Sequence, residues 1–131
     1  MGDPAGCGPQ ITALAWQARE AETLSPFFVV SDPDLYRRFG PVETISAPDQ
    51  AEAVFGRALP VLAHTAGISQ TVGVGTPSGA YASEIVESIK TATRLTLAGQ
   101  ALAVVTNPIS KAVLYQQGFK FPGHTEFIAS L

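Results

Sequence analysis

Hydrophobic residues follow two alternating patterns along this chain. After Pro9, apolar residues recur at the spacing i, i+3, i+4, i+7, which predicts an amphipathic helix. The residues of this stripe are Ile11, Leu14, Ala15 and Ala18. Three short apolar runs, at 27–30, 60–63 and 101–106, predict strands that are buried on both faces of a sheet.

Capping and terminating residues mark two further helices. Asp32 is expected to cap a short helix within residues 31–40, and Gly40 to end it. Ser78 is expected to cap the longest helix, which ends at Gly99. A single stripe along this helix predicts the face that packs on the core. Its residues are Ala82, Ile85, Val86, Ile89, Thr93 and Leu97.

The C-terminal third of the chain has the same kind of signals. Asn107 is expected to cap a helix that has Pro108 at its first position and ends at Gly118. A final helix is expected to begin near Thr125. Strands and helices that alternate in this way indicate an α/β fold with a mainly parallel sheet.

Composition narrows the classes of function. The chain has 131 residues, which suggests one domain, and a net charge of −3 with no basic run, so nucleic-acid binding has little support. No apolar run is long enough for a membrane span, and no secretory signal is visible. A soluble, cytoplasmic protein is therefore expected. Cys7 is the only cysteine, which excludes an internal disulfide, and we expect it to be a small apolar filler.

Two glycine-rich stretches precede helices. Residues 2–9, GDPAGCGP, either bring backbone N–H groups close to a bound anion or form only a strand-to-helix turn. Residues 72–84 carry Gly73, Gly75 and Gly79, but the third glycine comes one position late for a dinucleotide fingerprint. For residues 72–84 we therefore favour a helix-entry loop over a nicotinamide site.

Two stretches nearer the C-terminus carry more chemistry. Residues 104–112 include the carboxyl end of an expected strand, where open α/β sheets bind ligands, and the polar residues there are Thr106, Asn107, Ser110 and Lys111. Lys111 either meets a phosphate or carboxylate there or remains solvated. In PGHTE, residues 122–126, His124 can donate to an anion or act as a base, and Thr125 can cap the last helix. The alternative for PGHTE is a surface turn with a capping threonine.

The remaining histidine and the large aromatic residues are interpreted as structural. His64 has no partner at metal-ligand spacing, and the chain has no Cys-x-x-Cys motif, which argues against a complete metal site. Trp16 and Tyr81 are expected to be packing residues.

Three stretches, taken in their order and spacing, resemble the 4-hydroxythreonine-4-phosphate dehydrogenase family of pyridoxal phosphate biosynthesis. They are MGDPAGCGPQI, VVTNPISKAVL and GFKFPGHTEFIASL, and the resemblance runs from residue 1 to 131. It implies a three-layer α/β/α fold related to the isocitrate and isopropylmalate dehydrogenases. It also implies a homodimer with its active sites at the subunit interface.

The resemblance further implies a reaction and two substrate-binding residues. Enzymes of this family oxidise 4-phosphohydroxy-L-threonine with NAD or NADP, and the β-keto acid then loses CO2 with the help of a divalent metal (Zn, Mg or Co). The product is 3-amino-2-oxopropyl phosphate. The His-Thr pair of PGHTE contacts substrate in the family, so His124 and Thr125 are expected to bind substrate. Asn107 and Lys111 are expected near the site, and Asp3 has no assigned role.

Members of the family are much longer than this chain. Their metal-binding histidines and nicotinamide-binding segments lie beyond the position of Leu131, and a strand precedes their counterpart of MGDPAG. Residues 1–131 are therefore expected to be a partial α/β domain, the N-terminal portion of a longer dehydrogenase. We expect this portion to hold no metal ligands, to include no assignable catalytic or cofactor-binding residue, and to be inactive alone.

Two alternatives stay open. The parent enzyme could oxidise a related four-carbon phosphorylated acid or a cis-dihydrodiol, because part of the pocket that selects the substrate lies outside these residues. Otherwise the chain could be a non-catalytic anion-binding module that uses His124 and Thr125.

Overall fold

Three parallel strands form the sheet, in the order β1–β3–β2. The computed structural model describes residues 1–64, 68 and 72–131. The strands are β1 (Val29–Ser31), β2 (Val42–Ile45) and β3 (Leu59–Ala63). In the central strand β3, Val61 pairs with Val29 of β1 and with Thr44 of β2. The predicted α/β class and the strands expected at 27–30 and 60–63 are confirmed, the first of them shifted by two residues at its start.

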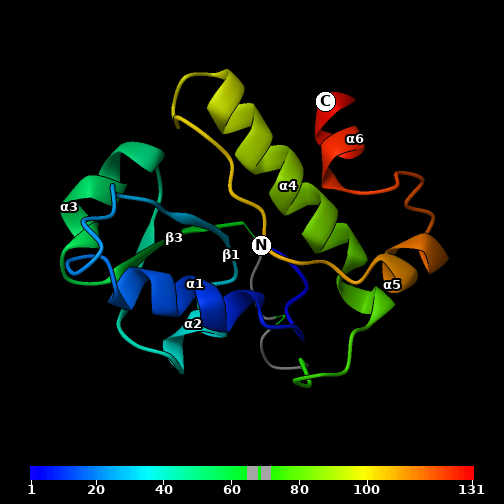
Figure 1. The fold of residues 1–131 in the computed structure, drawn as a ribbon, viewed down its shortest axis with the longest axis horizontal. Helices are drawn as coiled ribbons and strands as arrows, with labels where there is room; N and C mark the ends of the chain where they lie inside the picture. Colours follow the sequence, from blue (N-terminus) through cyan, green and yellow to red (C-terminus); the bar gives the residue numbers. More distant parts are fainter. Residues whose placement is uncertain (65–67, 69–71) are drawn as a thin grey trace.

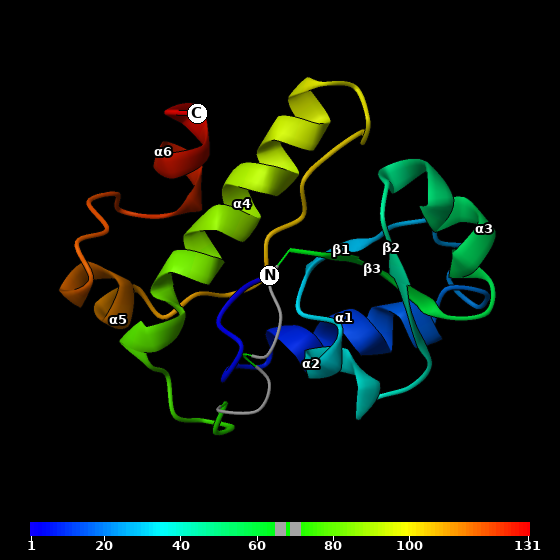
Figure 2. The same ribbon diagram turned by 180° about the vertical axis from the view of Figure 1, so that it is seen from behind.

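The helices form two groups, one among residues 8–55 and one among residues 82–129. The first group is α1 (Gly8–Gln17), α2 (Asp34–Arg37) and α3 (Ala51–Phe55), which follows the 3₁₀ turn η1 (Pro48–Gln50). The second group is α4 (Ala82–Leu97), preceded by the 3₁₀ turn η3 (Gly79–Tyr81), with α5 (Lys111–Gln116) and α6 (His124–Ala129). In both ribbon views α4 lies between the sheet and the pair α5 and α6 (Figures 1 and 2).

Side chains on the two faces of the sheet enter different clusters. Leu59 and Val61 of β3 are buried together with Trp16 of α1 and Tyr36 of α2. Leu62, which points the opposite way, packs against the cluster formed by α3 and β2. Helices therefore cover both faces, as a three-layer arrangement requires.

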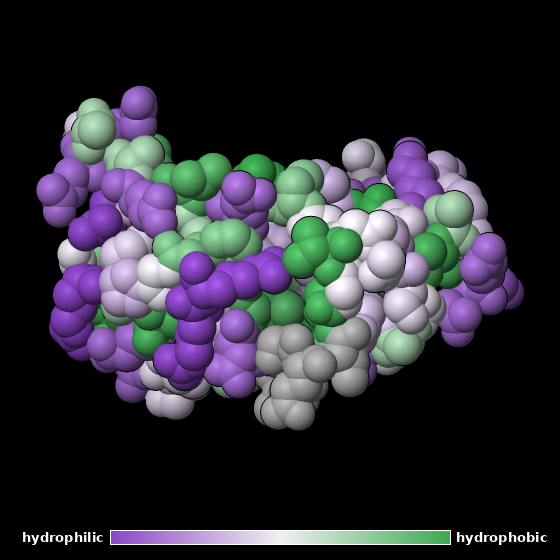
Figure 3. Space-filling view, turned by 90° about the horizontal axis from the view of Figure 1, so that it is seen from below, coloured by the Kyte–Doolittle hydropathy of each residue, from purple (hydrophilic) through white to green (hydrophobic). Residues whose placement is uncertain are grey.

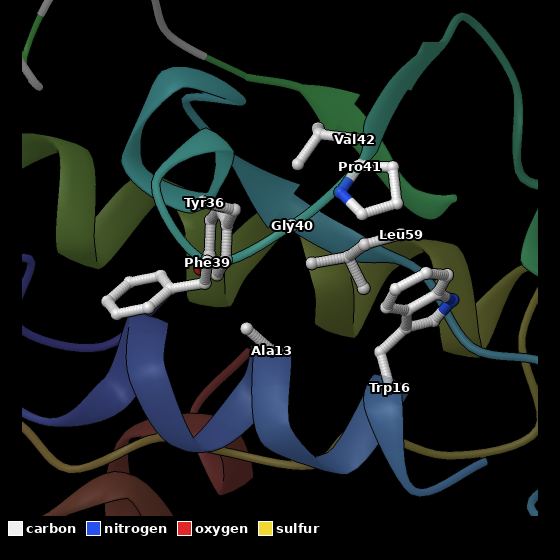
Figure 4. A pocket seen from close by; sticks show the side chains of 8 residues that line it. All are labelled: Ala13, Trp16, Tyr36, Phe39, Gly40, Pro41, Val42 and Leu59. Carbon is white, nitrogen blue, oxygen red and sulfur yellow. The ribbon is translucent and has the colours of Figure 1, made fainter. Parts of the chain in front are cut away.

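Helix α1 forms where the pattern predicts it but buries a different face. Ala13 and Trp16 point towards the sheet (Figure 4), and the indole Nε1 donates to the carbonyl oxygen of Phe55 at 2.8 Å. Ile11 and Leu14 of the predicted stripe are 43% and 52% exposed. The prediction of the buried face was wrong because the large indole, with its hydrogen-bond partner, decides which side of the helix is covered.

Most of the predicted helix caps and helix ends are found in the structure. An Asp32 carboxylate oxygen accepts from the backbone N–H of Asp34 at 2.9 Å, and Ser78 Oγ accepts from Ala80 N at 3.2 Å. Gly99 follows α4 with φ +72, the left-handed conformation that favours glycine. Of the predicted α4 stripe, Ala82, Ile85, Ile89 and Thr93 are buried, whereas Leu97 is 74% exposed.

The strand expected at 101–106 does not form. Leu102 is fully exposed, Val105 is 94% exposed, and residues 101–106 make no backbone hydrogen bond to any other described residue. An apolar run becomes a strand only where a neighbouring strand offers backbone partners, and none lies beside this run among the described residues. Strand β2 was missed because the polar residues Glu43 and Thr44 interrupt its apolar pattern.

Apolar side chains also reach the surface elsewhere. Viewed from below, hydrophobic residues occupy the middle of one face, bordered by hydrophilic ones (Figure 3). Cys7, expected to be an apolar filler, is exposed as well. Within the described part of the chain, no helix has the length and apolar character needed to cross a bilayer.

Candidate functional site

The N-terminal glycine turn, residues 2–8, is closed by tight packing. A Cβ atom at Gly2 would lie 2.4 Å from the carbonyl oxygen of Pro108 and 2.6 Å from Cβ of Asn107. A Cβ at Gly8 would lie 3.2 Å from the same Asn107 atom. The glycines thus allow two chain segments to touch, so the geometry favours the packing interpretation of this turn over an anion site.

Hydrogen bonds join the glycine turn to two other stretches that the sequence singled out. The backbone N–H of Asp3 donates to the carbonyl oxygen of Pro108 at 2.9 Å, and an Asp3 carboxylate oxygen accepts from Ala5 N at 2.9 Å. Gly75 N donates to the carbonyl oxygen of Ala5 at 2.8 Å. Asp3, without an assigned role in the sequence, is a buried residue that shapes this turn.

Asn107 stabilises this contact instead of capping a helix. Its side-chain Nδ2 donates to Thr12 Oγ1 at 2.9 Å, which ties the 107–108 segment to α1. Helix α5 begins only at Lys111, and its N-cap residue Ser110 makes no side-chain capping bond. The predicted cap at Asn107 was therefore wrong, because a partner on another helix takes the amide. The stop at Gly118, with φ +85, is confirmed.

The histidine turn, residues 121–126, is held by aromatic packing. Phe119 and Phe121 each lie 5.1 Å, centroid to centroid, from Phe127 of α6, and they are 5.5 Å from each other. These rings join a buried cluster with Leu114 of α5 and Ile85 of α4. Helix α6 has only six residues, so this packing, and not intrinsic helix stability, fixes the position of His124.

His124 is the first residue of α6 and has an imidazole atom without a partner. Its Nε2 is shielded from solvent and makes no hydrogen bond with any residue that the structure describes. Burial lowers the pKa of His124, and the positive charges of the Met1 amine and of Lys111 lower it further. The imidazole is therefore mainly neutral at pH 7. Thr125 is exposed and does not cap α6, whose N-cap residue is Gly123, so that prediction was wrong.

Lys111 lies beside the histidine turn. A Cβ atom built on Gly123 would be 3.7 Å from Lys111 Nζ and 3.5 Å from Glu126 Oε2. The missing side chain at Gly123 thus leaves space that the charged ends of α5 and α6 share. The structure brings Lys111, His124 and Glu126 together, although they are up to 15 positions apart in the sequence.

The expected relation to the sheet edge is not found. Residues 104–112 do not follow a strand, and α4 separates α5 and α6 from the sheet (Figures 1 and 2). Lys111 and His124 are assembled on the helical side of the molecule instead.

A buried polar group that the sequence reading overlooked lies at the carboxyl end of β1. Ser31, Asp32 and Tyr36 are each at most 1% exposed, and burial raises the pKa of Tyr36 to about 12. His64, at the end of β3, donates its backbone N–H to the carbonyl oxygen of Ser31 at 3.2 Å. The run VVSD, two polar residues directly after an apolar run, was the available signal.

The described residues do not fit a metal centre. They contain no group of three or more His, Cys, Asp or Glu side chains that could hold a metal ion. His64 and His124 lie in different parts of the fold, at the end of β3 and the start of α6.

Comparison with known proteins identifies the family. The family model described as "Pyridoxal phosphate biosynthetic protein PdxA" matches residues 23–131. The chain belongs to this family. It is 46% identical to the 4-hydroxythreonine-4-phosphate dehydrogenase of Methylorubrum populi over 138 aligned residues, covering 100% of this chain and 39% of that protein. The corresponding enzyme of Xanthobacter autotrophicus is 42% identical, with coverage of 99% and 38%.

Solved structures agree with the family assignment. The crystal structure of 4-hydroxythreonine-4-phosphate dehydrogenase from Klebsiella pneumoniae superposes with a TM-score of 0.82 at 28% identity, covering 99% of this chain and 42% of that one. A structure from Burkholderia phymatum, at 23% identity, has the same TM-score of 0.82 and supports the fold. The chain thus spans about two fifths of the length of these PdxA relatives.

Proposed function

We propose that this chain is the N-terminal, substrate-binding portion of a dehydrogenase that converts 4-phosphohydroxy-L-threonine to 3-amino-2-oxopropyl phosphate. The proposal is supported by the family match together with one feature of the site. That feature is the histidine turn, where His124 has an imidazole nitrogen without a partner and the hydroxyl of Thr125 is exposed. Relatives that align with 99% to 100% of this chain carry the name of that enzyme.

The chain's own residues would bind and orient the substrate. Neutral His124 can bond a substrate oxygen through Nε2, and the Thr125 hydroxyl can donate beside it. In the oxidation, the carbon that bears the hydroxyl group loses a hydride and the hydroxyl oxygen loses a proton. In the decarboxylation that follows, the bond to the carboxylate carbon breaks, CO2 leaves, and the electron pair left on the substrate carbon is protonated. When bound, NAD or NADP accepts the hydride and a divalent metal polarises the oxygen.

The metal ligands and the nicotinamide site of the proposed enzyme would lie outside the described residues. Because no described group fits a metal, its ligands would have to come from elsewhere in a longer polypeptide. The same applies to the nicotinamide site. We further propose that residues 1–131 form a partial domain of a cytoplasmic homodimer, and that the chain alone does not turn over substrate.

A chimera tests this function. The chain replaces the matched stretch of the Methylorubrum populi enzyme, and NADH is measured with 4-phosphohydroxy-L-threonine, phosphothreonate or a cis-dihydrodiol as substrate. We expect oxidation of the first compound, and a loss of at least about tenfold in kcat/KM for His124→Ala, since a hydrogen bond to an anionic substrate is removed. The matched control Lys120→Met should retain full activity.

The outcomes separate the alternatives. A preference for phosphothreonate or the dihydrodiol would replace the proposed substrate. A folded chimera that oxidises none of the three compounds would leave the non-catalytic anion-binding module as the better reading. NADH formation by the 131-residue chain alone would refute the proposal that further sequence is needed.

A further inference from the structure

The ends of α5 and α6 place two nitrogen-bearing side chains around one space. Lys111 is the first residue of α5 and His124 the first residue of α6, and a Cβ atom placed on Gly123 would lie 3.7 Å from the ammonium nitrogen of Lys111. The aromatic packing around Phe127 holds α6 in this position. Lys111 is also close enough for its charge to lower the pKa of His124, so the two side chains are neighbours.

Neither nitrogen has a hydrogen-bond partner within residues 1–64, 68 and 72–131. Lys111 makes no ion pair or hydrogen bond with any described residue, although Glu126 lies on the other side of Gly123. His124 Nε2 is removed from solvent and also lacks a partner. A shielded polar atom without a partner costs free energy, and a bound ligand with oxygen acceptors would remove that cost.

The charge around the imidazole favours an anion. Two amino groups lower the pKa of His124, the Met1 amine and the side chain of Lys111. Lys111 is the cation of the two on which an anion can rely, because burial lowers the pKa of the Met1 amine to about 6. No carboxylate acts on the imidazole strongly enough to balance them. A phosphate group, with two negative charges and several acceptor oxygens, suits an ammonium and an imidazole N–H better than a single carboxylate does.

We propose that Lys111 and His124 together bind the phosphate group of the substrate, with Lys111 as a specificity-determining residue that selects phosphorylated compounds. This proposal rests on the proposed function, and it adds a residue and a substrate group to it. Lys111 supplies the charge, and His124 supplies a directed hydrogen bond. Glu126, which is close to Lys111, opposes the binding of free phosphate.

Phosphate titration of the chain, followed by NMR of the His124 ring, tests the proposal. Inorganic phosphate is added to the wild type and to the variants Lys111→Met, Lys111→Arg, Lys120→Met and Glu126→Gln. We expect saturable shifts at His124 in the wild type and binding about tenfold weaker in Lys111→Met, because one charge-assisted contact is lost. Lys111→Arg should bind within about threefold of wild type, since the charge is kept.

Two further variants give matched controls. Lys120→Met removes the same charge from an exposed lysine outside the site and should leave binding unchanged. Glu126→Gln should strengthen binding, an effect opposite in sign to that of Lys111→Met. Sodium acetate at equal ionic strength serves as the carboxylate probe, and it should give no saturable shift.

Each outcome decides the matter. Equal phosphate affinity in Lys111→Met and wild type, no saturable binding by folded wild type, or tighter binding of acetate than phosphate would each overturn the proposal. Such results leave the chimera experiment untouched, so the proposed dehydrogenase function is judged separately. An inactive chimera with Lys111-dependent phosphate binding would instead reject the function and keep this site.

Discussion

The glycine turn and the histidine turn have the same kind of sequence, and the structure uses them in different ways. Both combine proline and glycine directly before a helix, in GDPAGCGP and FPGHTE. Around Gly2, backbone and Cβ atoms of another segment come as close as 2.4 and 2.6 Å to the position of a Cβ. Around Gly123 the nearest atoms are 3.5 Å away or more, and they belong to the ends of charged side chains.

This difference separates two reasons for a glycine before a helix. In the glycine turn the absent side chain lets two pieces of backbone touch, and the result is a packed contact without room for a ligand. In the histidine turn the absent side chain leaves a space lined by Lys111 and Glu126, next to His124. The identity of the neighbouring atoms, more than the glycine itself, distinguishes a structural turn from a binding turn.

The largest effect is expected for Gly2→Ala. The new methyl group would overlap the carbonyl oxygen of Pro108, which cannot move aside as a flexible side chain can. We expect a loss of about 3 kcal/mol in the free energy of unfolding, measured by urea denaturation. The matched control Gly123→Ala, where contacts are ordinary, should change it by less than about 0.5 kcal/mol. Similar losses for the two variants would remove the distinction between the turns.

A smaller effect is expected for the bond that fastens the glycine turn. Asn107→Ala and Thr12→Val each remove the hydrogen bond between these side chains and should each destabilise the chain by about 1 kcal/mol. The double variant should lose clearly less than the sum, because both changes remove one shared bond. Full additivity in the double-mutant cycle would mean that this bond does not hold the two segments together.

Local signals in the sequence predicted much of the fold. Asp32, Ser78 and Gly99 act through residues a few positions away, so their effects can be read from spacing. The predictions of the buried face of α1 and of a strand at 101–106 were wrong, because both features depend on which distant segment is available as a partner. The helix cap predicted at Asn107 was wrong for the same reason, since the side chain of Asn107 bonds to Thr12, 95 positions earlier.

The candidate site was predicted in its parts but not in its assembly. His124 and Lys111 were singled out by residue type and by resemblance, while their proximity across Gly123 became visible only in three dimensions. The position expected for Lys111, at the edge of the sheet, depended on a strand that does not form. The buried group of Ser31 and Tyr36 was missed because the polar pair at the end of VVSD was interpreted only as the start of a helix.

The smallest effect concerns the charge of the histidine turn. Burial, the Met1 amine and Lys111 lower the pKa of His124, so the folded chain resists protonation there more than the unfolded chain does. The unfolded state therefore binds more protons as pH falls below the ordinary histidine value of about 6.5, and the stability contributed by neutral His124 is present above that pH and decreases below it. The pKa values of His64 and of the Met1 amine are lowered as well, the second to about 6, so both groups add to the same loss of stability at low pH. A residue-specific measurement is therefore required.

NMR titration of the His124 ring should give a higher pKa in Lys111→Met than in wild type, because one nearby positive charge is gone, while Lys120→Met should leave it unchanged. An unchanged pKa in Lys111→Met would place the ammonium group too far away to share a ligand with His124, and the histidine turn would then be as closed to anions as the glycine turn.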